Sequence, residues 1–337
     1  MKRASVLVAA AALALSGCQS IPDMSEWNKA TKDVTSAVAQ GFQTSASLNG
    51  DIAKRLDAVL ESKPEFGDPS KRYASVARAL NQRADDYEKL FGAVADYSSA
   101  LAAISKAADN SGKTAEAVAG SVNGLIEAVG QSALAGAGFN LAKLLLSELI
   151  KVKAASDFGD AVEKADPIIG KISELLANDL NDLKRTVGSA KDEAIRAAIE
   201  IPTQSKLDYR TALERRRDAL QASVRTVVSP AGAPGATLPT GSLLNASDAP
   251  ELGKIEQYLK DADAWYLPYK AELGNALSTR GKSELLVTQT LRAVEAWRES
   301  HASIAKAVKE RRPPDSARLA ALAVKIRELV DELKKGK

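Results

Sequence analysis

Residues 69–109, PSKRYASVARALNQRADDYEKLFGAVADYSSALAAISKAAD, decide the fold class of this chain. Apolar side chains recur here at spacings of mainly three and four residues: Leu80, Tyr87, Leu90, Val94, Tyr97, Leu101, Ile104 and Ala108. That period places them on one side of a helix, as in the seam of a coiled coil. Asp68 is placed to cap this helix and Pro69 to occupy its first position. The spacing therefore predicts one helix of about 60 Å.

Similar stripes follow along the chain, separated by Gly and Pro. We expect helices from about Ser25 with an interruption near Gly41, over 51–61, from Asp166-Pro167, after Ile201-Pro202 and after Pro313-Pro314. We also expect a helical region over 114–155, and a helix over 251–312 with a kink or break near Pro268 and another near Gly281. Alternating β-branched runs bounded by turn pairs are missing from the sequence. The chain is therefore predicted to be all-α. Since long seams need partners, we expect an elongated antiparallel helical bundle with coiled-coil-like long helices.

The positions of these helix-breaking Gly and Pro residues also predict how the chain is divided into segments. Residues 1–17 read as a signal peptide, and 18–45 as an acylated cysteine with a tether and first helix. Residues 46–228 form the main helical bundle in this interpretation. Residues 229–250 are a Pro/Gly linker with a single charge, and 251–337 are C-terminal helices that pack on the bundle. Whether the linker separates two domains stays open at this point.

The N-terminus carries the most specific motif. Met1-Lys2-Arg3 is a short basic region, and the apolar run after it is too short to span a membrane. Leu15, Ser16, Gly17 and Cys18 close this segment. Small residues before the cysteine admit a signal peptidase, and the Cys18 thiolate is a nucleophile suited to take a diacylglyceryl group.

These four residues resemble the lipobox of bacterial lipoproteins. The resemblance covers only the targeting segment and implies cleavage before Cys18, followed by acylation with palmitate-type chains. Two or more acyl chains anchor a protein stably to a membrane. Gln19, in place of Asp, implies the outer membrane of a Gram-negative bacterium, with the body facing the periplasm; display on the cell surface stays an alternative. An ordinary secretory signal with a chance cysteine is the simpler alternative.

Composition excludes several function classes. Lys+Arg total 46 against 43 Asp+Glu, and this near-balance argues against nucleic-acid binding. One Cys and one His exclude a disulfide framework and a Cys/His metal site. We therefore predict no metal, no cofactor and no catalytic residues. His301 lies on an apolar stripe, which favours a buried, hydrogen-bonded histidine over catalysis or pH sensing.

Residues 117–146 form a Gly/Ala-rich segment with little charge. Small residues recur there every fourth position: Gly120, Gly124, Ala128, Ser132 and Gly136. On a helix they make one ridge that lets another backbone approach closely. The favoured interpretation is a buried, closely packed helix or hairpin. The alternative is a membrane-inserting segment, as in the layout of α-helical pore-forming toxins, which this arrangement resembles in layout only.

Arg215, Arg216 and Arg217 form a basic cluster among acidic neighbours. A solvated helix face is the favoured interpretation, and contact with anionic headgroups or envelope polymers is the alternative. Together these features predict a non-enzymatic, lipid-anchored module that binds or spaces other envelope proteins, with homo-oligomers as a further option. A membrane-active protein and a regulator of an envelope hydrolase are the alternative functions.

Overall fold

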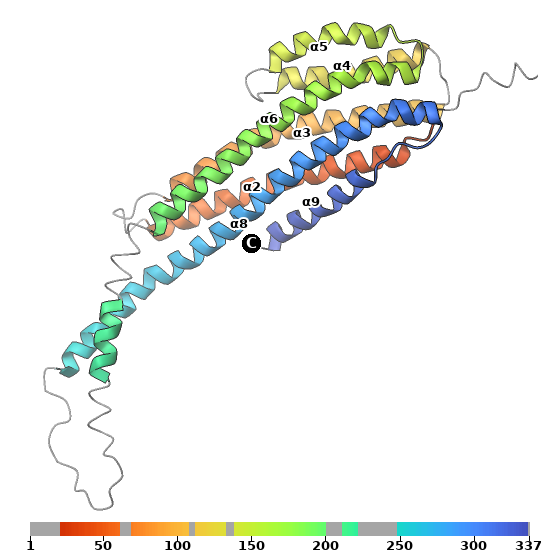
Figure 1. Ribbon diagram of the computed structural model, residues 1–337. Helices are drawn as coiled ribbons and strands as arrows, with labels where there is room; N and C mark the ends of the chain where they lie inside the picture. Colours follow the sequence, from red (N-terminus) through yellow and green to blue (C-terminus); the bar gives the residue numbers. More distant parts are fainter. Residues whose placement is uncertain are drawn as a thin grey trace, which may run out of the picture. The chain divides into compact units, whose positions relative to one another are not determined.

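The computed structural model describes residues 21–60, 69–107, 112–132, 138–199, 211–221 and 248–335. The helices are α2 (Ser25–Leu60), α3 (Pro69–Ala107), α4 (Gly112–Gln131), α5 (Gly138–Lys153), α6 (Phe158–Ile199), α8 (Asp248–Glu310) and α9 (Ala317–Lys335) (Figure 1). Residues 211–221 are also helical, and none of the described residues lies in a strand. The prediction of an all-α fold with long helices is confirmed.

The chain forms two compact units, each assembled from separate segments. Unit 1 comprises residues 1–48, 76–188 and 279–337, and unit 2 comprises residues 49–75 and 189–278. The division predicted from the sequence followed chain order, whereas these units collect segments that are distant in the chain. Residues 222–247, which include most of the predicted linker, lie outside the described residues.

In unit 1, α2 and α8 run antiparallel. Trp27 Nε1 donates a hydrogen bond to Ser300 Oγ (2.9 Å), and the Ser45 and Ser283 hydroxyls are 2.6 Å apart. Moving forward along α2 from Trp27 to Ser45 therefore means moving backward along α8. The predicted antiparallel packing is confirmed for this pair.

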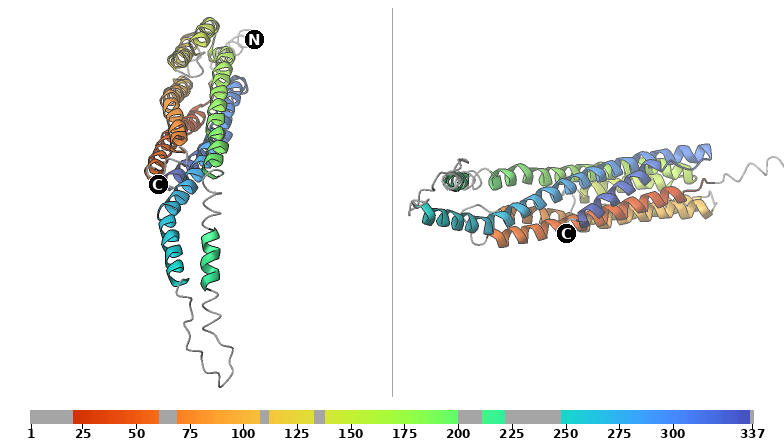
Figure 2. Two further views of the ribbon diagram at one scale, coloured as in Figure 1. Left: turned by 90° about the vertical axis from the view of Figure 1, so that its left-hand side faces the viewer. Right: turned by 90° about the horizontal axis from the view of Figure 1, so that it is seen from below.

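The other long helices of unit 1 pair in the same way. The Lys309 ammonium lies 3.0 Å from Glu163 Oε2 at the start of α6, and Arg280 Nε donates to the Val187 carbonyl (3.3 Å) farther along. These contacts set α6 antiparallel to α8. The Lys282 ammonium donates to the carbonyl of Glu332 near the end of α9 (3.0 Å). Figures 1 and 2 show these helices side by side within unit 1.

The core of unit 1 contains the apolar stripe predicted over 80–104, together with aromatic side chains that the sequence analysis did not single out. The largest fully buried side chains of this unit are Trp27, Phe42, Tyr87, Tyr97 and Phe158. Burial of such a side chain stabilises a fold by about 1.5–3 kcal/mol. Packing of the stripes, rather than helix propensity alone, therefore stabilises helices of this length.

Two expected helix boundaries, at Gly41 and at Asp166-Pro167, are wrong, and α8 is not broken at Pro268. Helix α2 passes through Gly41, α6 begins at Phe158 and contains Pro167, and α8 contains Pro268. A Cβ at Gly41 would lie 2.7 Å from Leu286 Cδ1, so the glycine serves close helix packing rather than a break. On either side of Pro167, Ala165 and Ile168 are completely buried, and this burial offsets the cost of proline within a helix.

Two further regions, around Gly281 and over 114–155, remain to be compared with the helices of the structure. Helix α8 is continuous at Gly281, where a Cβ would meet no atom within 4 Å. The helical region expected over 114–155 consists of α4 and α5, which contact each other (Figure 1).

Unit 2 has its own small apolar cluster. Leu220, Ile255 and Leu259 are buried together, and Leu213 packs against them. Arg55 and Glu272 form an ion pair of 2.8 Å within the same unit.

Among the helices that the structure describes, none combines the length and the apolar character needed to cross a membrane.

Candidate functional site: a groove between α6 and α8

A surface groove of about 700 Å³ lies between α6 and α8 of unit 1. Its α6 side runs from Pro167 to Asn181, and its α8 side runs from Leu291 to Arg298. Gly170, Ala177 and Val294 supply small or apolar surface between the charged residues. The volume falls within the range of ordinary ligand pockets, about 300–1,000 Å³.

The groove carries three cations: Lys171, Arg292 and Arg298. Neither arginine has an ion-pair partner among the described residues. Of the two groove carboxylates, Glu295 lies 3.3 Å from Arg318 Nη2 outside the groove. Guanidinium groups bind carboxylates and phosphates through two parallel hydrogen bonds. The two unpaired arginines are therefore available to an anionic group.

Ser173 lies in the lining and is 3% exposed. Its hydroxyl oxygen has no hydrogen-bond partner among the described residues. A buried polar group without a partner destabilises a fold by about 1–3 kcal/mol. Ser173 is therefore a polar position in the groove that contributes nothing evident to the packing of unit 1.

The end of the groove near Pro167 adjoins a buried polar relay. His301 is completely buried, with Nε2 2.7 Å from the Tyr97 hydroxyl and Nδ1 3.0 Å from Asp166 Oδ1. Burial, with the nearby Asp166 charge, raises the pKa of Tyr97 far above its usual value. Because both ring nitrogens are engaged, this geometry confirms the interpretation of His301 as a buried, hydrogen-bonded histidine. The relay ties α3, α8 and α6 together.

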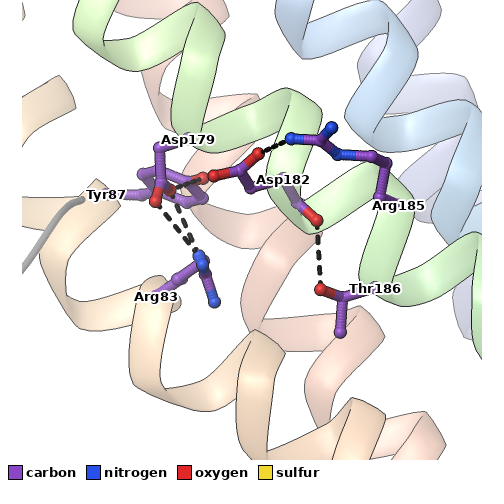
Figure 3. A network of polar contacts seen from close by, with 6 residues as sticks. All are labelled: Arg83, Tyr87, Asp179, Asp182, Arg185 and Thr186. Atoms are coloured by element: carbon purple, nitrogen blue, oxygen red, sulfur yellow. Dashed lines mark hydrogen bonds and ion pairs between the residues drawn. The ribbon is translucent and has the colours of Figure 1, made fainter.

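A second polar cluster joins α3 to α6 (Figure 3). Tyr87 donates its hydroxyl proton to Asp179 Oδ2 (2.5 Å), and Arg83 Nε lies 3.2 Å from the same oxygen. Burial first, and then the Asp179 charge, raises the pKa of the Tyr87 hydroxyl far above its usual value. One turn on, Asp182 pairs with Arg185 at the surface instead. The inward cluster holds α6, which forms one wall of the groove, against α3.

Chemically, this arrangement is suited to binding. The relay and the Asp179 cluster are occupied by contacts between helices, which leaves the arginines and the apolar surface facing the groove. Among the described residues, no group of three or more His, Cys, Asp or Glu side chains is placed to hold a metal ion.

The residues singled out in the sequence fall elsewhere. Leu15, Ser16, Gly17 and Cys18, together with Gly136, lie outside the described residues. Gly120 and Gly124 are exposed on α4, and a Cβ at either would meet no atom within 4 Å. No described backbone therefore approaches this part of the ridge, which corrects the expectation of close packing there. The buried side of α4 is instead apolar, with Val118, Val122, Leu125, Ile126 and Val129.

The other two ridge residues are more enclosed. Ala128 is half-buried and Ser132 is buried, with the Ser132 hydroxyl donating to the Val129 carbonyl (2.9 Å). Glu127 is exposed and accepts a hydrogen bond from Asn123 Nδ2 (2.6 Å). The first half of the segment therefore presents glycines and polar groups on its outer side.

The basic cluster lies in unit 2, on helical residues 211–221. Arg215 and Arg216 are exposed, and Arg217 pairs with Asp218 (2.9 Å). The lining of the groove belongs to unit 1 and includes none of these arginines.

Sequence reasoning missed the groove because its two walls are more than one hundred residues apart in the chain. A sequence signal exists in retrospect, since Gly170 and Ala177 interrupt a charged helix face. That signal becomes specific only when α8 is known to be the neighbour of α6. Comparison with protein-family models, curated proteins and solved structures finds no match for this chain.

Proposed function

We propose that this protein is a lipid-anchored, non-enzymatic module of the bacterial envelope that binds another envelope component in the α6–α8 groove. The observation that carries the binding role is the open groove with unpaired Arg292 and Arg298. The lipobox-like residues ending at Cys18 support the anchoring role, and Gln19 supports the assignment to the outer membrane.

Anchoring is tested by metabolic labelling with palmitate. The natural chain incorporates label and fractionates with outer membranes, whereas Cys18→Ala incorporates none. Absence of label from the natural chain would contradict the anchoring role. Because Cys18 is the sole cysteine, no other thiol of the chain competes for the acyl group.

Groove binding is tested by photo-crosslinking in cells. A photoreactive residue at Ala177 faces the groove, and one at the neighbouring exposed Asn178 is the matched control, since Asn178 is not part of the lining. We expect a discrete adduct from position 177 alone, and its loss when Gly170→Leu fills the groove. Equal adducts from both positions would argue against a specific groove.

A second candidate function rests on the α4–α5 hairpin. Leu146 and Ile150 lie one turn apart on α5 and are 47% and 68% exposed. Exposed apolar side chains of this kind suit contact with a bilayer. Residues 19–337, prepared without acyl chains, are therefore assayed for flotation with anionic liposomes and for dye leakage.

Leakage would favour this membrane-active candidate. It would have to disappear in Ala128→Asp while the helical circular-dichroism spectrum is retained. A folded protein that neither floats nor causes leakage leaves the acyl chains as its membrane contact and favours the groove-binding function.

A further inference from the structure

The start of the described chain lies very near the proposed anchor. Ile21 follows Cys18 by three residues, so the intervening chain reaches at most about 10 Å. Ile21 and Met24 are 7% and 0% exposed, and the Met24 amide donates to Ser105 Oγ at the end of α3 (3.3 Å). The packed body therefore begins almost directly at the acylated residue.

One end of unit 1 surrounds this starting point, and we call it the tether pole. It consists of the first turns of α2, α4, α6 and α9, the last turns of α3, α5 and α8, and the turn between α8 and α9. A Cβ at Gly159 would lie 3.3 Å from Val308, which places the start of α6 beside the end of α8. Figure 2 shows the start of α2 and the end of α8 at the same end of unit 1.

Several acidic side chains of the tether pole are engaged by the protein itself. Asp23, Asp157 and Asp315 each accept the backbone N–H of a residue two or three positions later, at the starts of α2, α6 and α9. Negative charge there is also stabilised by the positive end of the helix dipole. Glu310 is likewise held by Arg312 (2.5 Å).

Several cations of the tether pole have no such engagement. Lys113, Lys153 and Arg311 are exposed and form no ion pair among the described residues. Arg311 also has a φ of 54°, at the position after α8 where glycine is common. A non-glycine residue in this conformation is strained by about 1–2 kcal/mol. Glycine would avoid this strain, so an exposed and unpaired arginine is unusual at the end of a helix. Here it places a positive charge beside the proposed acyl anchor at Cys18.

We infer that the tether pole rests directly on a phospholipid surface with anionic headgroups, and that unit 1 projects from it. This inference rests on the proposed acylation of Cys18. The short connection holds the pole at headgroup depth, and the unpaired cations suit the phosphates there. The opposite end of unit 1 is then held away from the bilayer, because Lys282, beside the end of α9, precedes the end of α8 by about 40 Å of helix.

The sole cysteine makes a direct test possible. Once Cys18 carries its thioether, an introduced cysteine is the only free thiol. Lys153→Cys and Lys334→Cys are matched variants, since each removes an exposed lysine in the last turn of a helix, at opposite ends of unit 1. The acylated full chain is labelled with a fluorophore and reconstituted in phosphatidylethanolamine–phosphatidylglycerol vesicles that contain headgroup-nitroxide lipid.

We expect several-fold stronger quenching at position 153 than at position 334. Equal quenching at both positions would overturn the inference alone, provided that mass spectrometry shows Cys18 to be acylated. An unacylated Cys18 would overturn the proposed anchoring and this inference together, so the two failures are distinguishable.

Two further variants separate the tether from the cations. A flexible Gly/Ser insert of about 30 residues after Ser20 adds about 30 Å of root-mean-square reach. We expect it to reduce quenching at position 153, and unchanged quenching would refute the role of the short connection. Arg311→Gly is expected to raise Tm while weakening the quenching; a raised Tm with unchanged quenching would remove Arg311 from the lipid contact.

Discussion

Helix α8 has two sides in unit 1 that pack very differently. Toward α2, Leu286 is 1% exposed and lies against Gly41, and Ser283 bonds Ser45. Toward α6, Leu291 is only half-buried and lines the open groove. Both pairs of helices run antiparallel, so orientation does not explain the difference. Small and apolar residues pack tightly on the side of α8 that faces α2. On the side that faces α6, charged residues line an open groove.

This comparison teaches that an apolar stripe predicts burial but not how completely a helix pair closes. We call the α2-facing side the closed side and the α6-facing side the groove side. The two sides offer matched residues of the same type, and three pairs of substitutions test whether packing differs between them as described.

The largest expected contrast is between two leucines of α8. Leu286→Ala removes completely packed methyl groups and is expected to destabilise the fold by about 2–5 kcal/mol. Leu291→Ala loses half-buried surface and is expected to destabilise it by about 1 kcal/mol. Urea unfolding followed by circular dichroism measures both. Similar losses for the two variants would show that the groove side is as tightly packed as the closed side.

Two glycines provide the next contrast. Gly41→Leu would overpack against Leu286 and is expected to destabilise the fold by about 1–3 kcal/mol. At Gly170 a Cβ would meet no atom within 4 Å, so Gly170→Leu is expected to gain about 0.5–1 kcal/mol from helix propensity. Thermal unfolding of the two variants gives the sign of each change. Destabilisation by Gly170→Leu would indicate that the groove is closed in solution.

The smallest contrast concerns two buried serines. Ser45→Ala removes a hydrogen bond to Ser283 and is expected to destabilise the fold by about 1 kcal/mol. The Ser173 hydroxyl has no partner among the described residues, so Ser173→Ala is expected to be neutral or stabilising by up to about 1 kcal/mol. Chemical denaturation resolves the difference. A clear loss for Ser173→Ala would mean that its hydroxyl is bonded when the protein is in solution.

Sequence periodicity anticipated much of the core. The stripe from Leu80 to Leu101 is buried as predicted, because a three-and-four spacing places these side chains on one side of a helix. The expected helix boundaries at Gly41 and Pro167 were wrong, because close packing at these two positions offsets the local preference for a break. A breaker residue ends a helix only where packing does not offset its cost.

The predicted role of the Gly/Ala ridge depended on its neighbours. Gly120 and Gly124 have the spacing of a close-packing face, yet they lie on the exposed side of α4. The apolar residues Val118, Val122 and Leu125 occupy the buried side. When small and large apolar residues compete for a core, the larger ones bury more surface and therefore determine which side of the helix turns inward.

The sequence by itself determined that this protein is helical, because helix-forming residues and apolar periodicity act within one segment at a time. It also supplied the resemblance of Leu15 to Cys18 to a lipobox, which depends on adjacent residues in the chain. Only the tertiary structure decided that α6 and α8 enclose a groove and that His301 joins Tyr97 to Asp166. It also placed the end of α8 at the same end of unit 1 as the start of α2. The physical reason is that such sites arise from helix pairing, and pairing depends on the fit of side chains that are distant in the sequence.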